Sequence, residues 1–169
     1  ILHVITTINL GGAENHLYDL IVGQRHLGYQ VCVVYLKGDS YWKQKYQELG
    51  VETVCLNIIS YALLYRFYLL KKVIARFNAD AVHAHMPPAE LVARLALIGN
   101  NRTKFILSKH NDEPFAPYFK NRFLANWVAV RASAIICISK AVQSYIEGWL
   151  PSSQYSKLKL VYYCVDNEK

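Results

Sequence analysis

Residues 79–98 read ADAVHAHMPPAELVARLALI, and this stretch decides the prediction of the fold. Residues 81–84 predict a short strand. Pro87 and Pro88 then open a helix that continues to Ile98, because proline is tolerated in the first turn of a helix. The stretch therefore predicts a strand, a short loop that begins at His85, and a helix.

The same strand–helix unit repeats along the chain on both sides of this stretch. Further apolar runs predict strands at residues 1–7, 31–36, 51–56, 103–108, 134–138 and 158–163. Apolar side chains at helical spacing predict helices at residues 13–27, 41–49, 62–77, 118–130 and 140–149. Strands that alternate with helices form βαβ units, so we expect an α/β fold with an open, mainly parallel sheet and helices on both faces.

The composition indicates a folded domain with a basic surface. Of the 169 residues, 53% are hydrophobic and 18% are charged, which suits one domain with a large core. The net charge of +7 favours a phosphate-bearing ligand or an anionic bilayer surface, and no signature of a nucleic-acid-binding fold is present. The cysteines lack CxxC spacing and are expected to be buried, reduced thiols: Cys32, Cys55, Cys137 and Cys164.

The sequence shows no targeting segment. The chain starts in a strand-like run with no basic region or cleavage site before it, so we expect a cytoplasmic protein. No apolar run reaches the roughly 18–20 residues of a membrane-spanning helix. The first residue is not methionine, so we expect the numbering to begin inside a longer gene product.

A glycine motif follows the first predicted strand, and the carboxyl ends of strands are where such sheets bind ligands. In Gly11-Gly12-Ala13-Glu14, two glycines allow a ligand to approach the backbone, and the helix that follows offers N–H groups to an anion. The spacing is neither G-x-G-x-x-G nor a P-loop, so a dinucleotide or ATP cradle is not expected. A tight turn without a ligand is the alternative.

Two histidines stand at the end of the strand at residues 81–84. His83 and His85 point to the same side of the strand, because side chains alternate along it. No third histidine or carboxylate adjoins them in the sequence, so we expect no metal. We expect His83 to be packed and hydrogen-bonded within the strand. For His85, a ligand contact and a structural hydrogen bond are equally open.

Two further polar motifs follow later strands. In Ser108-Lys109-His110-Asn111-Asp112, His110 can donate to a phosphate or a sugar hydroxyl near neutral pH, whereas Lys109 can equally be a surface charge. Ser139 stands at the start of a helix, where a capping role needs no ligand. We expect residues 9–14, 85, 108–112 and 139 to lie along one edge of the sheet.

Taken in chain order, these motifs resemble the N-terminal half of a retaining glycosyltransferase of the GT-B fold, and family four of the glycosyltransferases most closely. The resemblance rests on Gly11-Gly12-Ala13-Glu14, Asp80-Ala81-Val82-His83-Ala84-His85, Lys109-His110-Asn111, Ile138-Ser139-Lys140 and Leu160-Val161-Tyr162-Tyr163-Cys164-Val165-Asp166. One departure is that Tyr163-Cys164 stands where the family usually carries Asn-Gly.

The resemblance implies a Rossmann-like fold and transfer of a sugar, with retention, from a nucleotide-sugar to a glycan or lipid-linked acceptor, as in cell-envelope polysaccharide synthesis. It implies no obligatory metal and no cofactor besides the donor substrate. His110 would be the catalytic residue beside the transferred sugar. The residues implied to bind substrate are Gly11, Gly12, Glu14, His85, Lys109, Asn111 and Ser139.

The family's second domain supplies most of the nucleotide pocket and a pair of glutamates spaced E-x7-E. No two glutamates of this chain are eight residues apart. We therefore expect residues 1–169 to be the N-terminal, mainly acceptor-side domain, inactive alone, with the donor-binding domain absent from this chain. Two other functions stay open: half of a nucleotide-sugar epimerase, and a non-catalytic sugar- or phosphate-binding module.

The predicted helix at residues 62–77 mixes aromatic and basic side chains, which suits peripheral contact with a membrane. The aromatic residues are Tyr61, Tyr65 and Tyr68, and the basic ones are Arg66, Lys71, Lys72 and Arg76. An ordinary helix with a solvated face is the alternative. A membrane contact would place the protein at the inner face of the membrane.

Overall fold

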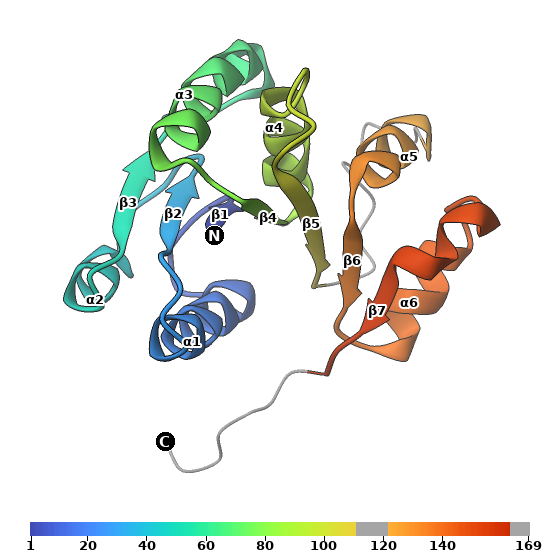
Figure 1. The fold of residues 1–169 in the computed structure, drawn as a ribbon, viewed down its shortest axis with the longest axis horizontal. Helices are drawn as coiled ribbons and strands as arrows, with labels where there is room; N and C mark the ends of the chain where they lie inside the picture. The colour runs from blue at the N-terminus through green and yellow to red at the C-terminus, as the bar shows by residue number, and fades with distance from the viewer. Residues whose placement is uncertain (111–121, 163–169) are drawn as a thin grey trace.

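The structure is a computed structural model that describes residues 1–110 and 122–162, and its centre is a seven-stranded sheet (Figure 1). The strands are β1 (Leu2–Ile5), β2 (Cys32–Tyr35), β3 (Glu52–Cys55), β4 (Ala81–His85), β5 (Lys104–Lys109), β6 (Ala134–Cys137) and β7 (Leu158–Leu160). They lie in the order β3-β2-β1-β4-β5-β6-β7, and every neighbouring pair is parallel. The sheet is the open α/β, Rossmann-like architecture that the sequence predicts.

Helices cover both faces of the sheet. The α-helices are α1 (Gly12–His26), α2 (Lys43–Glu48), α3 (Phe67–Phe77), α4 (Pro87–Ala96), α5 (Arg122–Arg131) and α6 (Lys140–Glu147), and two 3-10 helices are η1 (Tyr61–Arg66) and η2 (Ser152–Lys157). Figure 1 shows α1 and α2 on one face and α3, α4 and α5 on the other. This division follows from the strand order, because right-handed crossovers toward β3 and toward β7 place their helices on opposite faces.

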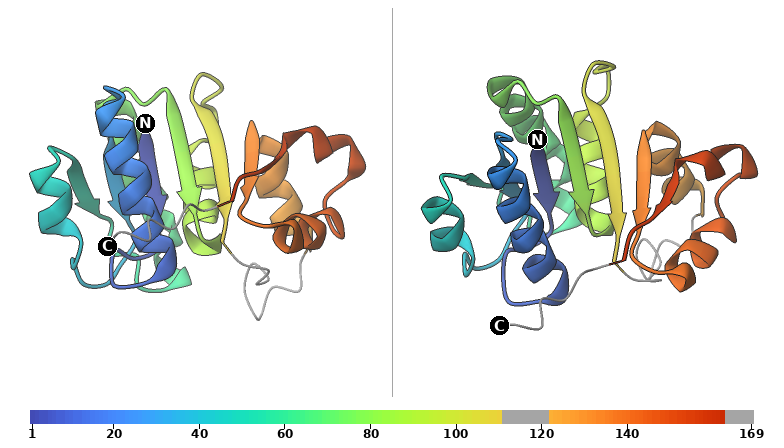
Figure 2. Two further views of the ribbon diagram at one scale, coloured as in Figure 1. Left: turned by 90° about the horizontal axis from the view of Figure 1, so that it is seen from below. Right: turned by 60° about the horizontal axis from the view of Figure 1, so that its bottom comes forward.

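The direction of strand addition reverses at β1. β2 and β3 add on one side of β1, whereas β4 to β7 add on the other. The loops after β1 and β4 therefore lead to opposite faces, and the carboxyl ends of two such strands are the usual ligand site of a sheet of this kind. Figure 2 shows the strands running toward the edge where the loop before α1 lies.

Two apolar clusters hold the layers together. The larger one packs the sheet against α3, α4, α5 and α6 and includes the fully buried Leu2, Val82 and Phe105. The smaller one packs β1 and β2 against α1 and α2 around Leu17 and Tyr46. Burial of apolar surface on both faces stabilises this layered arrangement, at roughly 25 cal/mol per Å².

Several local predictions are wrong in detail. Residues 61–66 form a 3-10 helix rather than the first part of an α-helix, and the 3-10 helix at Ser152–Lys157 is not predicted at all. Leu27, the last residue of the first predicted helix, lies just beyond α1 as its C-cap and is 77% exposed. Cys55 is only half-buried, and Cys164 lies outside the described residues.

Within residues 1–110 and 122–162, no helix has the length and apolarity needed to cross a membrane.

Candidate functional site

The predicted site residues lie at the carboxyl edge of the sheet. Gly11 precedes α1, His85 ends β4, Lys109 ends β5 with His110 directly after it, and Ser139 precedes α6. The expected alignment along one edge therefore holds for these residues.

Two residues of the predicted site lie outside the described residues: Asn111, predicted to bind substrate, and Asp112. The substrate contacts predicted for the other residues remain predictions.

The glycine loop is held by Glu14. Its Oε1 accepts a hydrogen bond of 2.6 Å from Thr7 Oγ1, and its carboxylate lies so close to Gly11 that a Cβ there would collide with it. A Cβ on Gly12, by contrast, would have no described atom within 4 Å. A side chain at Gly11 would therefore displace the Glu14 carboxylate, whereas Gly12 borders open space at the helix N-terminus.

An imidazole cluster lies on the face of the sheet that α1 covers. Its members are His3, His16, His83, His85 and His110. The pairing register places His3 beside His83 on adjacent strands. His83 is 5% exposed, and its Nε2 lies 2.7 Å from Ser108 Oγ, which confirms the predicted hydrogen bond within the sheet.

His85 connects the interior of the cluster to the sheet edge. Its Nε2 lies 3.0 Å from His3 Nδ1, and its Nδ1 lies 3.1 Å from His110 Nε2. His110 in turn stands edge-on to the ring of His16 on α1, with ring centroids 6.0 Å apart. The structural hydrogen bond, one of the two roles open for His85, is therefore present, and its contact with a substrate remains a prediction.

Three buried imidazoles are close enough to hold a metal ion. His3, His83 and His85 each offer one ring nitrogen, and these nitrogens lie within 4.8 Å of one another. The third ligand comes from β1, about eighty residues away in the sequence, so the local motif could not reveal it. Two of the three rings already share a hydrogen bond, and the expectation of no metal remains a prediction.

Burial keeps the imidazole cluster neutral. Desolvation lowers the pKa of His3 to about 4, although the hydrogen bond to Gln24 opposes this shift. Desolvation, with smaller contributions from His16 and Lys109, lowers the pKa of His110 to about 4. The pKa values of His83 and His85 fall well below the ordinary value for the same reason. His110 is therefore a neutral imidazole at pH 7.

Lys109 is not a surface charge. Its Nζ lies 2.5 Å from Glu90 Oε2, and its side chain is 12% exposed while that of Glu90 is fully buried. Burial raises the pKa of Glu90, although the nearby Lys109 ammonium opposes the shift. The other oxygen of this carboxylate, Oε1, is buried and has no hydrogen-bond partner in the described part of the chain.

Backbone strain marks the end of β4. Met86 follows His85 with a φ of 75° and a ψ of 142°, a conformation that residues other than glycine rarely adopt. It is the N-cap of α4, so the turn from strand to helix passes through this strained residue. Ser139, in contrast, caps α6 conventionally, because its Oγ accepts a hydrogen bond of 3.2 Å from the Val142 backbone N–H.

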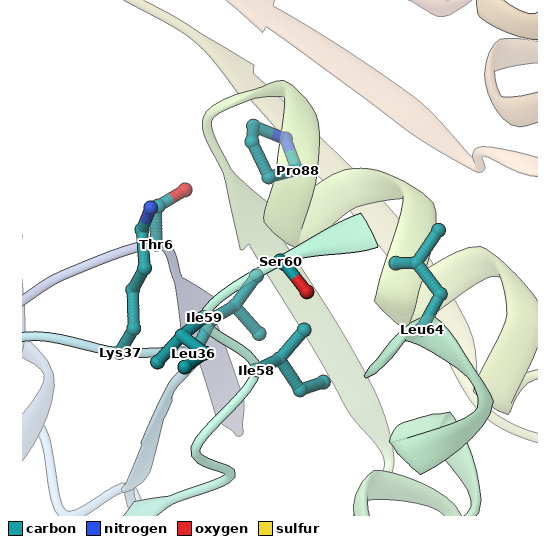
Figure 3. A pocket seen from close by; sticks show the side chains of 8 residues that line it. All are labelled: Thr6, Leu36, Lys37, Ile58, Ile59, Ser60, Leu64 and Pro88. Atoms are coloured by element: carbon teal, nitrogen blue, oxygen red, sulfur yellow. The ribbon is translucent and has the colours of Figure 1, made fainter. Parts of the chain in front are cut away.

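An apolar pocket of about 200 Å³ opens at the same edge, beside the ends of β1, β2 and β3 (Figure 3). Its walls are Thr6, Leu36, Lys37, Ile58, Ile59, Ser60, Leu64 and Pro88. Ile59 is 68% exposed at its rim, whereas Leu36 and Ile58 are buried in its floor. The pocket offers a largely hydrophobic surface with a lysine and hydroxyl groups at its border.

Residues 10–169 match the family model described as Glycosyltransferase Family 4. The chain belongs to Glycosyltransferase Family 4. No curated protein sequence matches the chain significantly.

Solved structures of glycosyltransferases share the fold of this family 4 chain. The crystal structure of Anabaena Alr3699/HepE in complex with UDP matches with a TM-score of 0.75 and 20% identity, over 98% of this chain and 44% of HepE. The lipopolysaccharide outer core galactosyltransferase WaaB in its apo form matches with a TM-score of 0.72 and 13% identity, over 99% of this chain and 50% of WaaB. UDP-GlcNAc 2-epimerase from Neisseria meningitidis, bound to UDP-GlcNAc, matches with a TM-score of 0.59 and 15% identity, over 94% of this chain and 45% of the epimerase.

The chain spans half the length or less of these relatives, and such low identities establish the fold alone.

Sequence reasoning missed three residues of this family 4 site: His3, His16 and Glu90. His3 and Glu90 carried a usable signal, since each interrupts a buried apolar pattern, one in a strand and the other in a helix face. His16 carried none, because its spacing on α1 also suits a solvated position.

Proposed function

We propose that this chain is the acceptor-side domain of a glycosyltransferase that transfers a sugar, with retention, from a nucleotide-sugar to a glycan or lipid-linked acceptor. Membership of Glycosyltransferase Family 4 and the GT-B-like fold support the proposal. HepE, one of the similar structures, was crystallised with UDP-glucose, and WaaB is named a galactosyltransferase. The observation that carries the proposal is the half-buried His110 at the carboxyl end of β5, whose ring lies 6.0 Å from that of His16 on the helix that follows the glycine loop.

In this proposal His110 contacts the transferred sugar or its phosphate. The N-terminus of α1 at Gly12 offers N–H groups toward the donor, and Gly11 leaves room for the Glu14 carboxylate beside the loop. Lys109 adds positive charge near the site, although Glu90 already pairs with it. A donor-binding domain would form the second wall, where basic side chains and helix N-termini stabilise the leaving diphosphate without an obligatory metal.

The apolar pocket favours a lipid-linked acceptor over a free glycan within this proposal. A glycan offers mainly hydroxyl groups, and the floor of the pocket at Leu36 and Ile58 would leave these groups without hydrogen-bond partners. An acyl or isoprenoid chain would instead fill the space and bury the exposed Ile59. Lys37 at the border can face an acceptor phosphate.

Substitution of His110 tests the proposal in the full-length protein. His110→Ala should lower kcat/KM by roughly 10–1,000-fold, equivalent to about 1.4–4 kcal/mol of transition-state stabilisation. His26→Ala, at an exposed position on α1, is the matched control and should leave kcat/KM unchanged. Full activity of His110→Ala would contradict the assigned role. Sugar transfer by residues 1–169 alone would contradict the requirement for a second wall.

An epimerase is the second candidate, because UDP-GlcNAc 2-epimerases share this fold. Incubation of the full-length protein with a nucleotide-sugar and no acceptor separates the two functions. Conversion to an epimeric nucleotide-sugar under these conditions supports the epimerase. Consumption of the donor only when an acceptor is present supports the glycosyltransferase. Binding without any conversion supports the non-catalytic module.

Peripheral contact with an anionic membrane, at its cytoplasmic face, is the last part of the proposal. On α3 and the 3-10 helix before it, Tyr65 and Tyr68 are 58% and 44% exposed, and the Lys72 ammonium lies 5.4 Å from the centre of the Tyr68 ring. The side chain of Tyr61 lies outside the described part. Exposed rings beside cations suit a headgroup layer.

Vesicle sedimentation tests this contact. Binding should be stronger to vesicles with anionic lipid than to neutral ones, and Lys71→Gln with Lys72→Gln should reduce it severalfold. The pair Lys43→Gln and Lys45→Gln on α2, on the other face of the sheet, is the control. Equal binding to both vesicle types, or to neither, would reject the membrane contact.

A further inference from the structure

Three histidines and a glutamine form one linear chain of hydrogen bonds through the interior. Gln24 Oε1 lies 2.8 Å from His3 Nε2, His3 Nδ1 lies 3.0 Å from His85 Nε2, and His85 Nδ1 lies 3.1 Å from His110 Nε2. These hydrogen bonds run from the last turn of α1, through β1 and β4, to the residue that follows β5. His3 and His85 are fully buried, so solvent does not compete for the bond between them, and the two outer bonds are partly buried.

These hydrogen bonds have one donor-to-acceptor direction, and Gln24 sets it. A neutral imidazole carries one N–H and one lone pair, and an amide oxygen can only accept. With Gln24 Oε1 as acceptor, His3 must carry its proton on Nε2 and accept on Nδ1. His85 must then donate from Nε2 and accept on Nδ1, and His110 must donate from Nε2.

This direction of the hydrogen bonds requires that each imidazole is neutral, and burial favours the neutral form. Desolvation lowers the pKa values of His3 and His110 to about 4 and that of His85 well below its ordinary value. Within the described residues, His83, His16, Lys109 and the N-terminal ammonium each disfavour an added positive charge on at least one of these rings. These groups act in the same direction as burial.

We propose that Gln24, His3 and His85 are positioning residues that hold His110 in the tautomer with the proton on Nε2 and the lone pair on Nδ1. His110 then carries a lone pair, rather than a second N–H, on Nδ1. A hydrogen-bond acceptor there suits a sugar hydroxyl and disfavours direct contact with a phosphate oxygen. This consequence for the ligand rests on the proposed function, whereas the tautomer itself does not.

The same rings are less suited to hold a metal. The nitrogens of His3 and His85 that would face an ion already bond to each other at 3.0 Å. The rings of His83 and His85 pack against each other with centroids 4.2 Å apart and planes inclined by 36°. A zinc ion would have to break the His3–His85 hydrogen bond and repack rings that are buried.

Nitrogen-15 NMR of the histidine-labelled full-length protein tests the proposal directly. At pH 7.5, the His110 spectrum should show a protonated Nε2 and an unprotonated Nδ1, with the assignment taken from the signal lost in His110→Gln. A wild-type His110 protonated on Nδ1 would overturn the proposal without any variant. Saturable uptake of Zn²⁺ that shifts the His3, His83 and His85 signals together would overturn it in favour of a metal centre.

Three substitutions of Gln24 sharpen the test. Gln24→Glu keeps an acceptor and should keep the tautomer, whereas Gln24→Met removes the acceptor and should produce a mixture at His110. Gln24→Lys, if folded, offers only donors and should reverse the tautomer. An unchanged His110 tautomer in a folded Gln24→Met variant would contradict control by Gln24. A merely structural Gln24 would alter stability without moving this signal.

Activity separates this proposal from the proposed function. If Gln24→Met changes the tautomer, kcat of sugar transfer should fall about tenfold with little change in KM for the donor, and Gln24→Glu should restore it. A changed tautomer with unchanged kcat would contradict the catalytic consequence while leaving sugar transfer established. Absence of sugar transfer in the wild type would contradict the proposed function, even where the tautomer is as expected.

Discussion

The two faces of the sheet are built from different chemistry. The face toward α3, α4, α5 and α6 presents apolar residues from every central strand, including Val4, Val82 and Phe105. The face toward α1 presents His3, His83 and His85 from β1 and β4, where apolar residues would ordinarily stand. Buried polar groups are tolerated only when hydrogen-bonded, and each of these rings has a partner. Both faces thus contribute apolar clusters, but the face toward α1 also buries three hydrogen-bonded imidazoles.

The largest expected effect of this difference is a loss of stability in acid, caused by the imidazoles on the face toward α1. The imidazole cluster has lowered pKa values in the folded state, so the unfolded chain takes up protons first as pH falls below about 6.5. The free energy of unfolding should therefore fall between pH 6.5 and about 4, by about 1.4 kcal/mol per pH unit for each ring that stays neutral. Glu90, whose pKa burial raises, opposes this loss weakly.

The four rings are those of His3, His83, His85 and His110. Together they should lower the free energy of unfolding by roughly 5 kcal/mol per pH unit near pH 5.5, which is enough to unfold an ordinary domain. Circular dichroism at 222 nm against pH should show a cooperative loss of helix between pH 6 and 4. His26→Gln, at an exposed position, should leave the curve unchanged. A protein that stays folded at pH 4 would show that these rings accept protons in the native state.

The same contrast explains how much of the molecule could be predicted from its sequence. Apolar runs and helical spacing depend on local pattern, so the strands, most helices and the edge that carries His110 and Ser139 could be predicted. The hydrogen bond between His3 and His85 joins residues 82 positions apart and depends on the register of β1 against β4. No local pattern encodes that register, and the pairing of Lys109 with Glu90 was missed for the same reason.

Lys109 and Glu90 are a charged exception on the otherwise apolar side of the sheet. Lys109→Met would leave the fully buried Glu90 carboxylate without its cation, which should lower the free energy of unfolding by about 3 kcal/mol at pH 8. Burial already raises the pKa of Glu90, so the loss should shrink toward pH 7 as the carboxyl takes up a proton more readily. Urea denaturation at the two pH values measures this.

Two controls isolate the ion pair. Lys104→Met changes an exposed lysine at the start of the same strand. This substitution should lower the free energy of unfolding by less than about 0.5 kcal/mol. Adding Glu90→Gln to Lys109→Met removes the uncompensated charge and should recover about half of the loss. Equal stability of Lys109→Met and wild type at pH 8 would mean that the pair contributes nothing and that Lys109 is available to a ligand.

The smallest expected effect concerns Ser139, where a structural and a ligand-binding role can be separated. Ser139→Ala removes the cap of α6 and should lower the free energy of unfolding by about 1 kcal/mol, whereas Ser144→Ala, at an exposed position inside the same helix, should change it by less than about 0.5 kcal/mol. Ser139→Asp also caps the helix and should restore stability, but it adds a negative charge at the edge where an anionic donor is proposed to bind. Restored stability together with a raised KM for the donor in the full-length protein would support a position close to the ligand. Restored stability with an unchanged KM would assign Ser139 to the helix cap alone, because a carboxylate within a few ångströms of a diphosphate would repel it.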